Sequence, residues 1–192
     1  MLSVIIPTLN SERGLMVTLP VLVPGAMSGL VREVTLADGG STDNTLAIGD
    51  GAGCAVLASQ APLGRRLGEA AAAARSPWLM FLRPGTVLDS SWVDESARFM
   101  EEADIMKGAT APAAVFRRSV GAPAGAPAMR EALGLMAFSL FGRVRPGQGL
   151  VIRSSLYQQV GGHRETAADT EKDLLARLGG RRIVMLRSSA RT

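Results

Sequence analysis

Polar side chains follow three apolar runs of the sequence, and one of them is a guanidinium. The first run ends at Pro7 and Thr8, and the second ends at Asp38. The third run, WLMFL, stops at Arg83-Pro84-Gly85. In open α/β sheets the ligand binds outside the carboxyl ends of the strands, so these residues are expected to meet at one crevice. Because guanidinium groups match the geometry of phosphate oxygens, Arg83 is compatible with an anionic substrate.

The elements that would position these residues alternate between short apolar runs and helical stretches. This alternation is typical of a Rossmann-related α/β fold, with a mostly parallel central sheet and helices on both faces. In the first half, strands are expected at 2–9, 33–37, 54–59 and 78–82, with helices at 13–26, 45–53 and 65–76. In the second half, helices are expected at 89–104 and 170–180, strands at 111–119 and 181–189, and a strand leading into a short helix at 149–162.

Length and composition bound the number of domains and the class of partner. The chain has 192 residues, enough for one domain with a sizeable core, so residues 1–192 are expected to form a single domain. A composition of 47% hydrophobic and 20% charged residues is ordinary for a soluble globular protein. The net charge of +4 without a dense basic cluster argues against a nucleic-acid partner. Cys54, the only cysteine, allows no intramolecular disulfide, which favours a reducing, cytoplasmic location.

Two segments between residues 120 and 145 have distinctive compositions. Residues 120–129 are rich in proline, glycine and alanine, which predicts a mobile loop. Residues 132–145 are apolar and end with two arginines. We expect this segment to be a core or dimer helix rather than a membrane-surface helix, although the sequence leaves both a homodimer and a peripheral membrane contact open. No apolar run reaches the ~18 residues that a membrane span requires.

The order and spacing of the motifs resemble those of the family 2 glycosyltransferases. SVIIPTLNSE, followed about thirty residues later by VTLADGGSTDNT, is similar to the amino-terminal half of those enzymes. The double glycine, together with GRRLGEAAAAARSPWLMFL, GQGLVIRSSLYQQVGG and SSART, is similar to one bacterial subgroup often associated with radical-SAM and selenium-related gene neighbourhoods. The resemblance covers nearly the whole chain and implies a GT-A fold.

The same resemblance implies transfer of a sugar from a nucleotide-diphosphate donor, typically a UDP-sugar, to a hydroxyl acceptor. The departing diphosphate is negative, so a cation or an arginine must stabilise that charge. The positions that match the family's nucleoside pocket are Pro7, Thr8, Glu12, Asp38, Gly40 and Ser41. Among them, Asp38 would accept a hydrogen bond from the base. The residues alone leave a purely structural alternative open. In it, Asp38 stabilises its turn, and Ser41 to Asp43 cap the next helix, without contact to a ligand.

The strand end at Arg83-Pro84-Gly85 departs from the family pattern. The family normally has a histidine or aspartate, a spacer and an aspartate there, and the last carboxylate anchors a divalent metal. Hard divalent cations need oxygen ligands, which arginine and glycine side chains do not offer. Asp89 comes four residues too late to replace them. We therefore predict no metal site of the family type, and no cofactor besides the nucleotide-sugar substrate.

Later acidic positions are altered as well. Pro146-Gly147-Gln148 stands where the subgroup tends to have Gly-Asp-Gln, and Thr170-Glu171 stands where it tends to have Glu-Asp, the source of the catalytic base. Glu171 could still act as the general base, with Asp169 and Asp173 as alternatives, or all three could form a solvated acidic first helical turn. His163 replaces an apolar residue of the family and is expected to be an ordinary surface residue, with a loop histidine near the acceptor side as the alternative.

Three function classes remain after this comparison. In the first, the protein is a metal-independent transferase in which Arg83 replaces the cation, aided by Arg65, Arg66 or Arg153. In the second, it is a catalytically inactive nucleotide-binding or interaction module that retains the fold. A nucleotidyltransferase or other nucleotide-binding enzyme is the third class, but no phosphate-binding glycine motif of the expected form follows any strand. The partners expected for the first class are a nucleotide sugar and an unknown acceptor.

Overall fold

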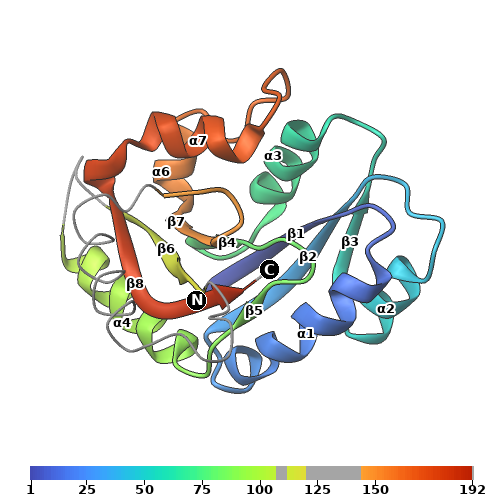
Figure 1. The fold of residues 1–192 in the computed structure, drawn as a ribbon, viewed down its shortest axis with the longest axis horizontal. Helices are drawn as coiled ribbons and strands as arrows, with labels where there is room; N and C mark the ends of the chain where they lie inside the picture. The colour runs from blue at the N-terminus through green and yellow to red at the C-terminus, as the bar shows by residue number, and fades with distance from the viewer. Residues whose placement is uncertain (107–111, 120–143, 192) are drawn as a thin grey trace, which may run out of the picture.

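The structure is a computed structural model that describes residues 1–106, 112–119 and 144–191. The expected loop at 120–129 and nearly all of the apolar segment 132–145 lie outside these described residues. The described strands form one mixed sheet in the order β3-β2-β1-β4-β7-β6-β8-β5 (Figure 1). The expected α/β class, a central sheet with helices on both faces, is confirmed.

The amino-terminal half of the sheet is parallel, as expected. Its strands are β1 (Leu2–Thr8), β2 (Val31–Asp38), β3 (Ala55–Ala58) and β4 (Trp78–Phe81), with β1 between β2 and β4. The helices that connect them are α1 (Glu12–Met27), α2 (Thr45–Gly51) and α3 (Leu63–Ala73). Helix α1 continues through both of its prolines. This half brings the ends of β1, β2 and β4 to one edge of the sheet.

The carboxyl-terminal half mixes directions. Its elements are β5 (Val87–Leu88), α4 (Trp92–Ile105), β6 (Ala113–Arg118), β7 (Leu150–Arg153), α6 (Ser154–Gln159), α7 (Thr170–Leu178), the 3-10 turn Gly180–Arg182 and β8 (Ile183–Arg191). Strand β7 runs antiparallel to β4 and β6, whereas β6 and β8 are parallel. Strand β5 pairs with the end of β8, an antiparallel pair that the sequence analysis missed because two residues show no periodicity.

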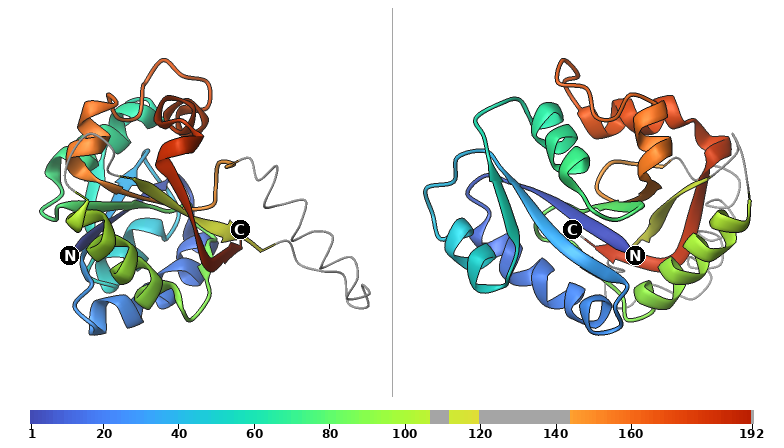
Figure 2. Two further views of the ribbon diagram at one scale, coloured as in Figure 1. Left: turned by 90° about the vertical axis from the view of Figure 1, so that its left-hand side faces the viewer. Right: turned by 180° about the vertical axis from the view of Figure 1, so that it is seen from behind.

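Helices cover both faces of the sheet, and the sheet divides the core into two layers (Figures 1 and 2). On one face, α1 and α4 pack Leu15, Trp92 and Phe99 against alternate residues of β1 and β4. On the other face, α3, α6 and α7 pack leucines and Tyr157 against Ile5 and the residues on the opposite side of β4. Since strand side chains alternate between faces, a strand buried on both sides must be apolar throughout, as β1 and β4 nearly are.

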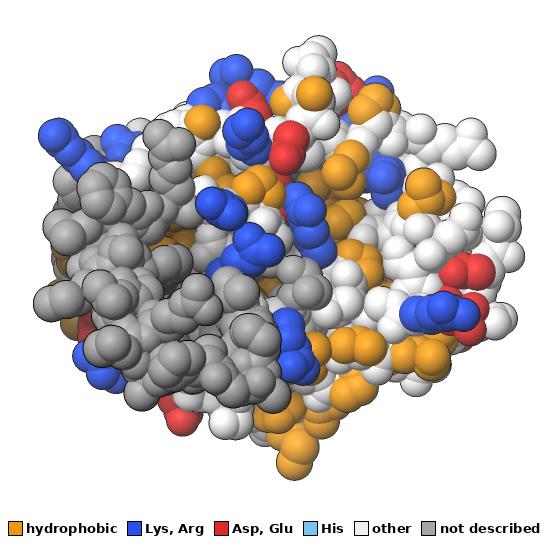
Figure 3. Space-filling view, in the orientation of Figure 1, with side chains coloured by type: hydrophobic (Ala, Val, Ile, Leu, Met, Phe, Trp, Pro, Cys, Tyr) orange, Lys and Arg blue, Asp and Glu red, His pale blue; other side chains and the backbone are white. Residues whose placement is uncertain are grey.

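Helix α1 also presents apolar side chains to solvent. Met16, Val23 and Met27 are more than half exposed, and apolar atoms line the edge of the molecule where α1 lies (Figure 3). No helix among the described residues combines the length and the apolar character needed to span a bilayer.

Candidate functional site

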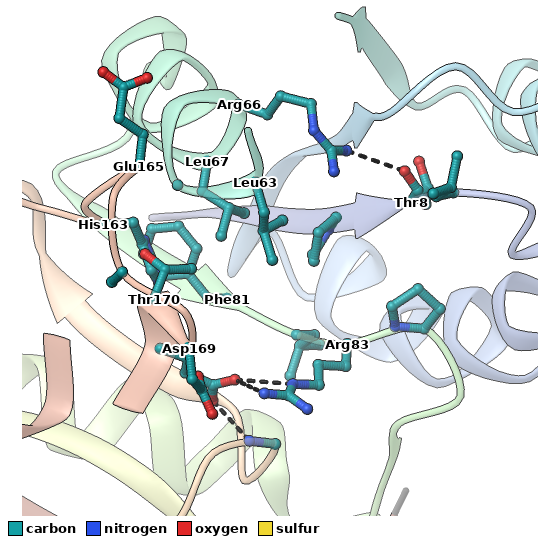
Figure 4. A pocket seen from close by; sticks show the side chains of 18 of the residues that line it. Thr8, Leu63, Arg66, Leu67, Phe81, Arg83, His163, Glu165, Asp169 and Thr170 are labelled. Carbon is teal, nitrogen blue, oxygen red and sulfur yellow. Dashed lines mark hydrogen bonds and ion pairs between the residues drawn. The ribbon is translucent and has the colours of Figure 1, made fainter. Parts of the chain in front are cut away.

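A cavity of about 640 Å³ opens at the carboxyl ends of β1 and β4. Its walls come from the end of β1, the first turns of α3, the residues after β4, the turn before β7, and the segment that leads into α7 (Figure 4). Pro7, Thr8, Arg83 and Glu171, all singled out from the sequence, line this cavity. Strand order therefore brings together side chains that are more than 160 positions apart, from Pro7 to Glu171.

The Asp38 carboxylate lies beneath the β2 turn and is fully buried. Its Oδ1 accepts hydrogen bonds from the hydroxyls of Thr8 at 2.8 Å and Ser41 at 2.5 Å, and its Oδ2 accepts the backbone N–H groups of Gly40 and Ser41, each at 2.8 Å. Burial alone would raise the pKa of Asp38, but these hydrogen bonds outweigh it and hold that pKa below the usual value. In this geometry Asp38 stabilises the turn, and a contact with a nucleobase would require the turn to change.

The loops after β1 and β2 are tied together by side-chain hydrogen bonds. The Asn10 N–H donates to Ser41 Oγ at 2.9 Å, and the Thr42 N–H donates to Asn10 Oδ1 at 2.8 Å. The carboxylate of Glu12 accepts the side-chain amide of Asn44 at 3.2 Å. Glu12, Gly40 and Ser41 thus belong to the pair of loops next to the cavity, but they do not line the cavity itself. These two loops are the part of the site that the family resemblance assigns to the nucleoside.

Arg66 of α3 holds the ends of β1 and β2 in place. Its Nη1 donates to the carbonyl oxygen of Thr8 at 3.1 Å (Figure 4). The same Nη1 donates to Ala37 O at 2.6 Å, and Nε donates to Ala61 O at 3.1 Å. Three backbone acceptors hold this guanidinium in place. Arg66 lines the cavity, but its hydrogen bonds to backbone carbonyls are those of a structural clamp rather than of a free phosphate-binding group.

Arg83 and Glu171 form an ion pair across the lower part of the cavity. The Nε and Nη2 of Arg83 lie 2.9 and 2.7 Å from Glu171 Oε2, while Glu171 Oε1 accepts the Gly147 N–H at 2.7 Å (Figure 4). The Arg83 side chain is 47% exposed and that of Glu171 is 18% exposed. Arg83 therefore points toward α7 rather than toward the Asp38 side, yet it is open enough to reorient.

Close packing against α1 fixes the backbone beside Arg83. The Gly85 N–H donates to Gly14 O at 3.1 Å and to Thr18 Oγ1 at 2.9 Å. A Cβ atom at Gly14 would lie 2.7 Å from the Cβ of Pro84, which is closer than two carbon atoms pack. Helix α1 can therefore approach this loop only because residue 14 has no side chain.

Replacing Gly14 by alanine is expected to lower the free energy of unfolding by about 1–3 kcal/mol, because the added methyl group must displace Pro84. Since Arg83 directly precedes Pro84 in the chain, the same change should alter ligand binding at the cavity. Gly51→Ala is the matched control, because a Cβ at Gly51 would meet nothing within 4 Å. Urea unfolding of both variants measures the difference, and equal stability of the two would contradict this account of the packing.

The residues at the end of β4 do not fit a divalent cation. Arg83 brings a positive charge, Pro84 and Gly85 bring no side-chain oxygen, and the nearby carboxylate of Glu171 is already bound to Arg83 and Gly147. Over the described ranges, no three histidine, cysteine, aspartate or glutamate side chains lie close enough together to hold a metal ion. The donor chemistry here is that of a guanidinium site.

Other candidates from the sequence lie elsewhere. Arg65 pairs with Glu69 on the exposed side of α3, and Arg153 pairs with Asp104 beside Trp78, at the opposite end of β4. Neither lines the cavity, so the idea that they assist Arg83 is not supported by their positions. Asp169 lines the cavity and caps α7 by accepting the Lys172 N–H at 3.0 Å, whereas Asp173 is paired with Arg177 outside it.

His163 is not the surface residue that the sequence predicted. It is only 8% exposed and lines the cavity, with its ring packed edge-on against Phe81 at 4.7 Å between centroids. Its Nδ1 lies 3.0 Å from the Tyr157 hydroxyl. The sequence analysis also did not single out Thr170 as a ligand-facing residue or Phe81 and Leu67 as cavity walls. Thr170 stands next to Glu171 and Phe81 ends β4, whereas Leu67 lies inside α3 and had no such signal.

Burial of His163 makes the stability of the protein depend on pH. Burial, with Arg177 assisting and Asp173 opposing, lowers the pKa of His163 from 6.5 to about 4. The unfolded chain therefore binds a proton that the folded protein does not, and stability falls as the pH drops from about 6.5 to about 4, by about 3 kcal/mol in total. Urea unfolding should give a lower free energy of unfolding at pH 4.5 than at pH 7 for the wild type. The His163→Phe variant should lose less of this free energy between the two pH values. An equal loss in both proteins would contradict the burial of His163.

Comparison with solved structures identifies the fold. The crystal structure of S. aureus TarS residues 1–349 in complex with UDP is 19% identical and has a TM-score of 0.72, with all of this chain and 60% of that chain covered. The UDP-GlcNAc complex of the same protein has a TM-score of 0.69. Glucosyl-3-phosphoglycerate synthase from Mycobacterium tuberculosis, in complex with Mn²⁺, UDP and glucosyl-3-phosphoglycerate, is 20% identical with a TM-score of 0.65, over all of this chain and 72% of that chain.

These likenesses confirm the GT-A fold that the sequence analysis expected. At 18–21% identity they are similarities of fold. The chain spans 36–60% of the length of the TarS chains that it matches. No protein-family model and no curated protein matches the sequence.

Proposed function

We propose that the protein transfers a sugar from a UDP-sugar to a hydroxyl acceptor without a divalent cation. In this proposal Arg83 binds the diphosphate and Glu171 is the general base. The observation that carries it is the Arg83–Glu171 pair inside the cavity where β1 and β4 end, because one site then holds both a cation for the leaving group and a carboxylate for the acceptor. The UDP and UDP-sugar complexes of structurally similar proteins support this donor class.

The proposed reaction exchanges one bond at the sugar for another. The acceptor oxygen bonds to the anomeric carbon, and the bond from that carbon to the β-phosphate oxygen breaks, so its electron pair leaves with UDP. The acceptor proton passes to the Glu171 carboxylate. A guanidinium beside the β-phosphate stabilises the charge that develops on the leaving oxygen.

The ion pair seen here corresponds to the ligand-free state of this mechanism. A diphosphate brings more negative charge than one carboxylate, so it can compete with Glu171 for Arg83. Because the Arg83 side chain is about half exposed, a change of rotamer is sterically open. Once Arg83 turns to the phosphates, Glu171 keeps its Gly147 hydrogen bond and gains a free oxygen for the acceptor proton.

UDP release tests this function. The purified protein is incubated with UDP-glucose or UDP-GlcNAc in EDTA, with a panel of sugar and lipid-linked hydroxyl acceptors, and free UDP is measured. We expect release that requires Glu171 and that added Mn²⁺ does not increase. Release that appears only with Mn²⁺ would contradict the metal-independent mechanism.

A nucleotide-binding module without transfer activity is the second candidate. The observation that favours it is that Arg83 and Glu171 neutralise each other and that Asp38 accepts three hydrogen bonds within its own turn and one from Thr8 of β1, so these groups are stable without a ligand. UDP binding without release from any UDP-sugar supports the module. Failure to bind UDP at all points instead to an interaction module.

A further inference from the structure

Exposed arginines lie at the carboxyl edge of the sheet, beyond the cavity that contains Arg83. Strand β6 ends with Arg117 and Arg118, and β8 ends with Arg191. All three residues are exposed. Basic side chains gather around the end of β8, in the middle of the face seen in Figure 1 (Figures 1 and 3). The proposed transfer reaction gives these arginines no role.

Strand register places Arg117 level with Arg83. Phe81 of β4 pairs with Leu150 of β7, and Leu150 pairs with Val115 of β6. Because β7 is antiparallel to both neighbours, β4 and β6 run in the same direction. Arg83 follows Phe81 by two residues, and Arg117 follows Val115 by two residues. Both arginines therefore stand at the same edge of the sheet.

The turn before β7 connects these two positions and adds another arginine. Arg145 is exposed, and its backbone N–H donates to Gln148 Oε1 at 2.6 Å. The Gln148 side chain is buried and donates from Nε2 to Phe116 O of β6 at 2.8 Å. In the same turn, the Gly147 N–H donates to Glu171. This turn therefore lies between the ion pair in the cavity and the end of β6.

Strand β8 extends the set of arginines further along the edge. Arg118 pairs with Ala190, the residue directly before Arg191. Three strand-to-strand steps separate β4 from β8 in the sheet order, a span of about 14 Å, which is longer than the diphosphate of one nucleotide. We name this set the arginine row, and its members are Arg117, Arg118, Arg145 and Arg191.

The arginine row carries an excess of positive charge. In the parts of the chain that the structure describes, no carboxylate lies within 4.0 Å of a guanidinium nitrogen of the row. Asp89, which follows β5 beside the end of β8, accepts backbone N–H groups from Ser91 and Ser189. The planar fork of a guanidinium binds two phosphate oxygens at once. The row therefore suits a ligand with more than one phosphate group.

Two other phosphate-rich partners fit this surface less well. Proteins stack single-stranded nucleic acid on exposed aromatic side chains, whereas every aromatic side chain of the described residues is buried. Membrane surfaces bind faces that combine basic with exposed apolar side chains. None of the large exposed apolar side chains of residues 1–106, 112–119 and 144–191 belongs to β6, to the turn before β7 or to the end of β8.

Strand order places the arginine row and the nucleoside loops on opposite sides of Arg83. The loops after β1 and β2 lie on one side of β4, whereas β7, β6 and β8 lie on the other side. Glu171 contacts both Arg83 and the turn before β7. A molecule that lies along the row can therefore reach Glu171 without crossing the place assigned to the nucleoside.

We infer that the arginine row binds a phosphate-bearing acceptor and guides its hydroxyl group to Glu171. The role as acceptor rests on the proposed function, whereas the binding of phosphate groups by the row does not.

Calorimetric titration with short-chain inorganic polyphosphate tests the row, in the presence of saturating UDP that occupies Arg83. We expect the Arg117→Ala/Arg118→Ala double variant to lower the affinity for polyphosphate about tenfold or more. UDP affinity should stay unchanged, because neither residue lines the cavity. Equal polyphosphate affinity in this variant and the wild type, or no binding by the wild type, overturns the inference.

The matched control is the Arg32→Ala/Arg181→Ala double variant. It removes two exposed arginines near the starts of β2 and β8, at the opposite edge of the sheet. Its polyphosphate affinity should equal that of the wild type, and a loss as large as that of Arg117→Ala/Arg118→Ala would mean that only overall charge matters. If the wild type does not bind UDP, the proposed function fails, and the same titration without UDP decides on the row.

The UDP-release assay tests the acceptor role with acceptors offered in pairs, glucose 6-phosphate with glucose and glycerol 3-phosphate with glycerol. We expect a lower KM for the phosphate-bearing member of a pair, and Arg145→Ala should raise that KM about tenfold with kcat retained. Equal KM values within each pair overturn the acceptor role. Polyphosphate binding without release from any acceptor would overturn it as well and leave only the phosphate site.

Vesicles of phosphatidylglycerol and of phosphatidylcholine distinguish an acceptor from a membrane surface. We expect neither kind of vesicle to sediment the protein. Sedimentation with phosphatidylglycerol that Arg117→Ala/Arg118→Ala abolishes, without binding of polyphosphate, would assign the row to a membrane and overturn the inference.

Discussion

Replacing Arg83 by alanine is expected to weaken UDP binding by about 10- to 100-fold, the effect of losing charge-assisted hydrogen bonds to phosphate. The guanidinium stands at the end of β4 inside the cavity, with half of its side chain open to solvent. UDP release from a UDP-sugar should fall further, by about 10²–10³-fold, because charge on the leaving diphosphate is greatest in the transition state. Calorimetry and a UDP-release assay measure the two effects.

Two further variants make the result specific to the guanidinium. Arg83→Lys keeps the charge but loses the planar fork, so we expect an intermediate affinity. Arg65→Ala removes an arginine that pairs with Glu69 outside the cavity, so UDP affinity should stay at the wild-type value. If Arg65→Ala and Arg83→Ala weaken UDP binding equally, the effect reflects overall charge and the assignment of Arg83 is wrong.

Replacing Glu171 by glutamine is expected to have opposite effects on catalysis and on binding. Turnover should drop by about 10²–10⁴-fold, because the amide cannot take the acceptor proton. UDP affinity should stay the same or rise up to about fivefold, because the partly exposed ion pair with Arg83, worth about 1 kcal/mol or less, no longer competes with phosphate. UDP release and calorimetry on the same preparation test both.

Asp169→Asn is the control for Glu171. Asp169 also lines the cavity and carries the same charge, but its side chain caps α7. We expect this variant to lose some stability and to keep turnover far above that of Glu171→Gln. Loss of turnover in Asp169→Asn alone would move the base to that residue.

The sequence could predict the parallel half of the fold because its central strands β1 and β4 are buried apolar runs, although the edge strand β3 is exposed. Strands β1 and β4 are covered on both faces, so each is an almost unbroken apolar run in the sequence. Such a run predicts both where the strand lies and which polar residue follows its end. The short β5 could not be found, because its two residues gain their structure from pairing with the distant end of β8. Non-local pairing of this kind leaves no periodic pattern.

The candidate site shows the same division. The position of Arg83 at a strand end followed from the run WLMFL, but its pairing with Glu171, 88 residues away, depends on the tertiary structure. Arg66 offered the same guanidinium chemistry in the sequence, and only the fold shows that backbone carbonyls occupy it. The sequence around His163 gives no sign of burial, whereas in the structure its loop packs the ring against Tyr157 and Phe81.

The most direct test of the central claim is titration of the wild-type protein with UDP, first in EDTA and then in excess Mn²⁺. If Arg83 takes the place of a cation, UDP binds in EDTA and Mn²⁺ leaves the affinity unchanged. Binding that appears only with Mn²⁺ would mean that a metal holds the diphosphate, and it would contradict the role given to Arg83.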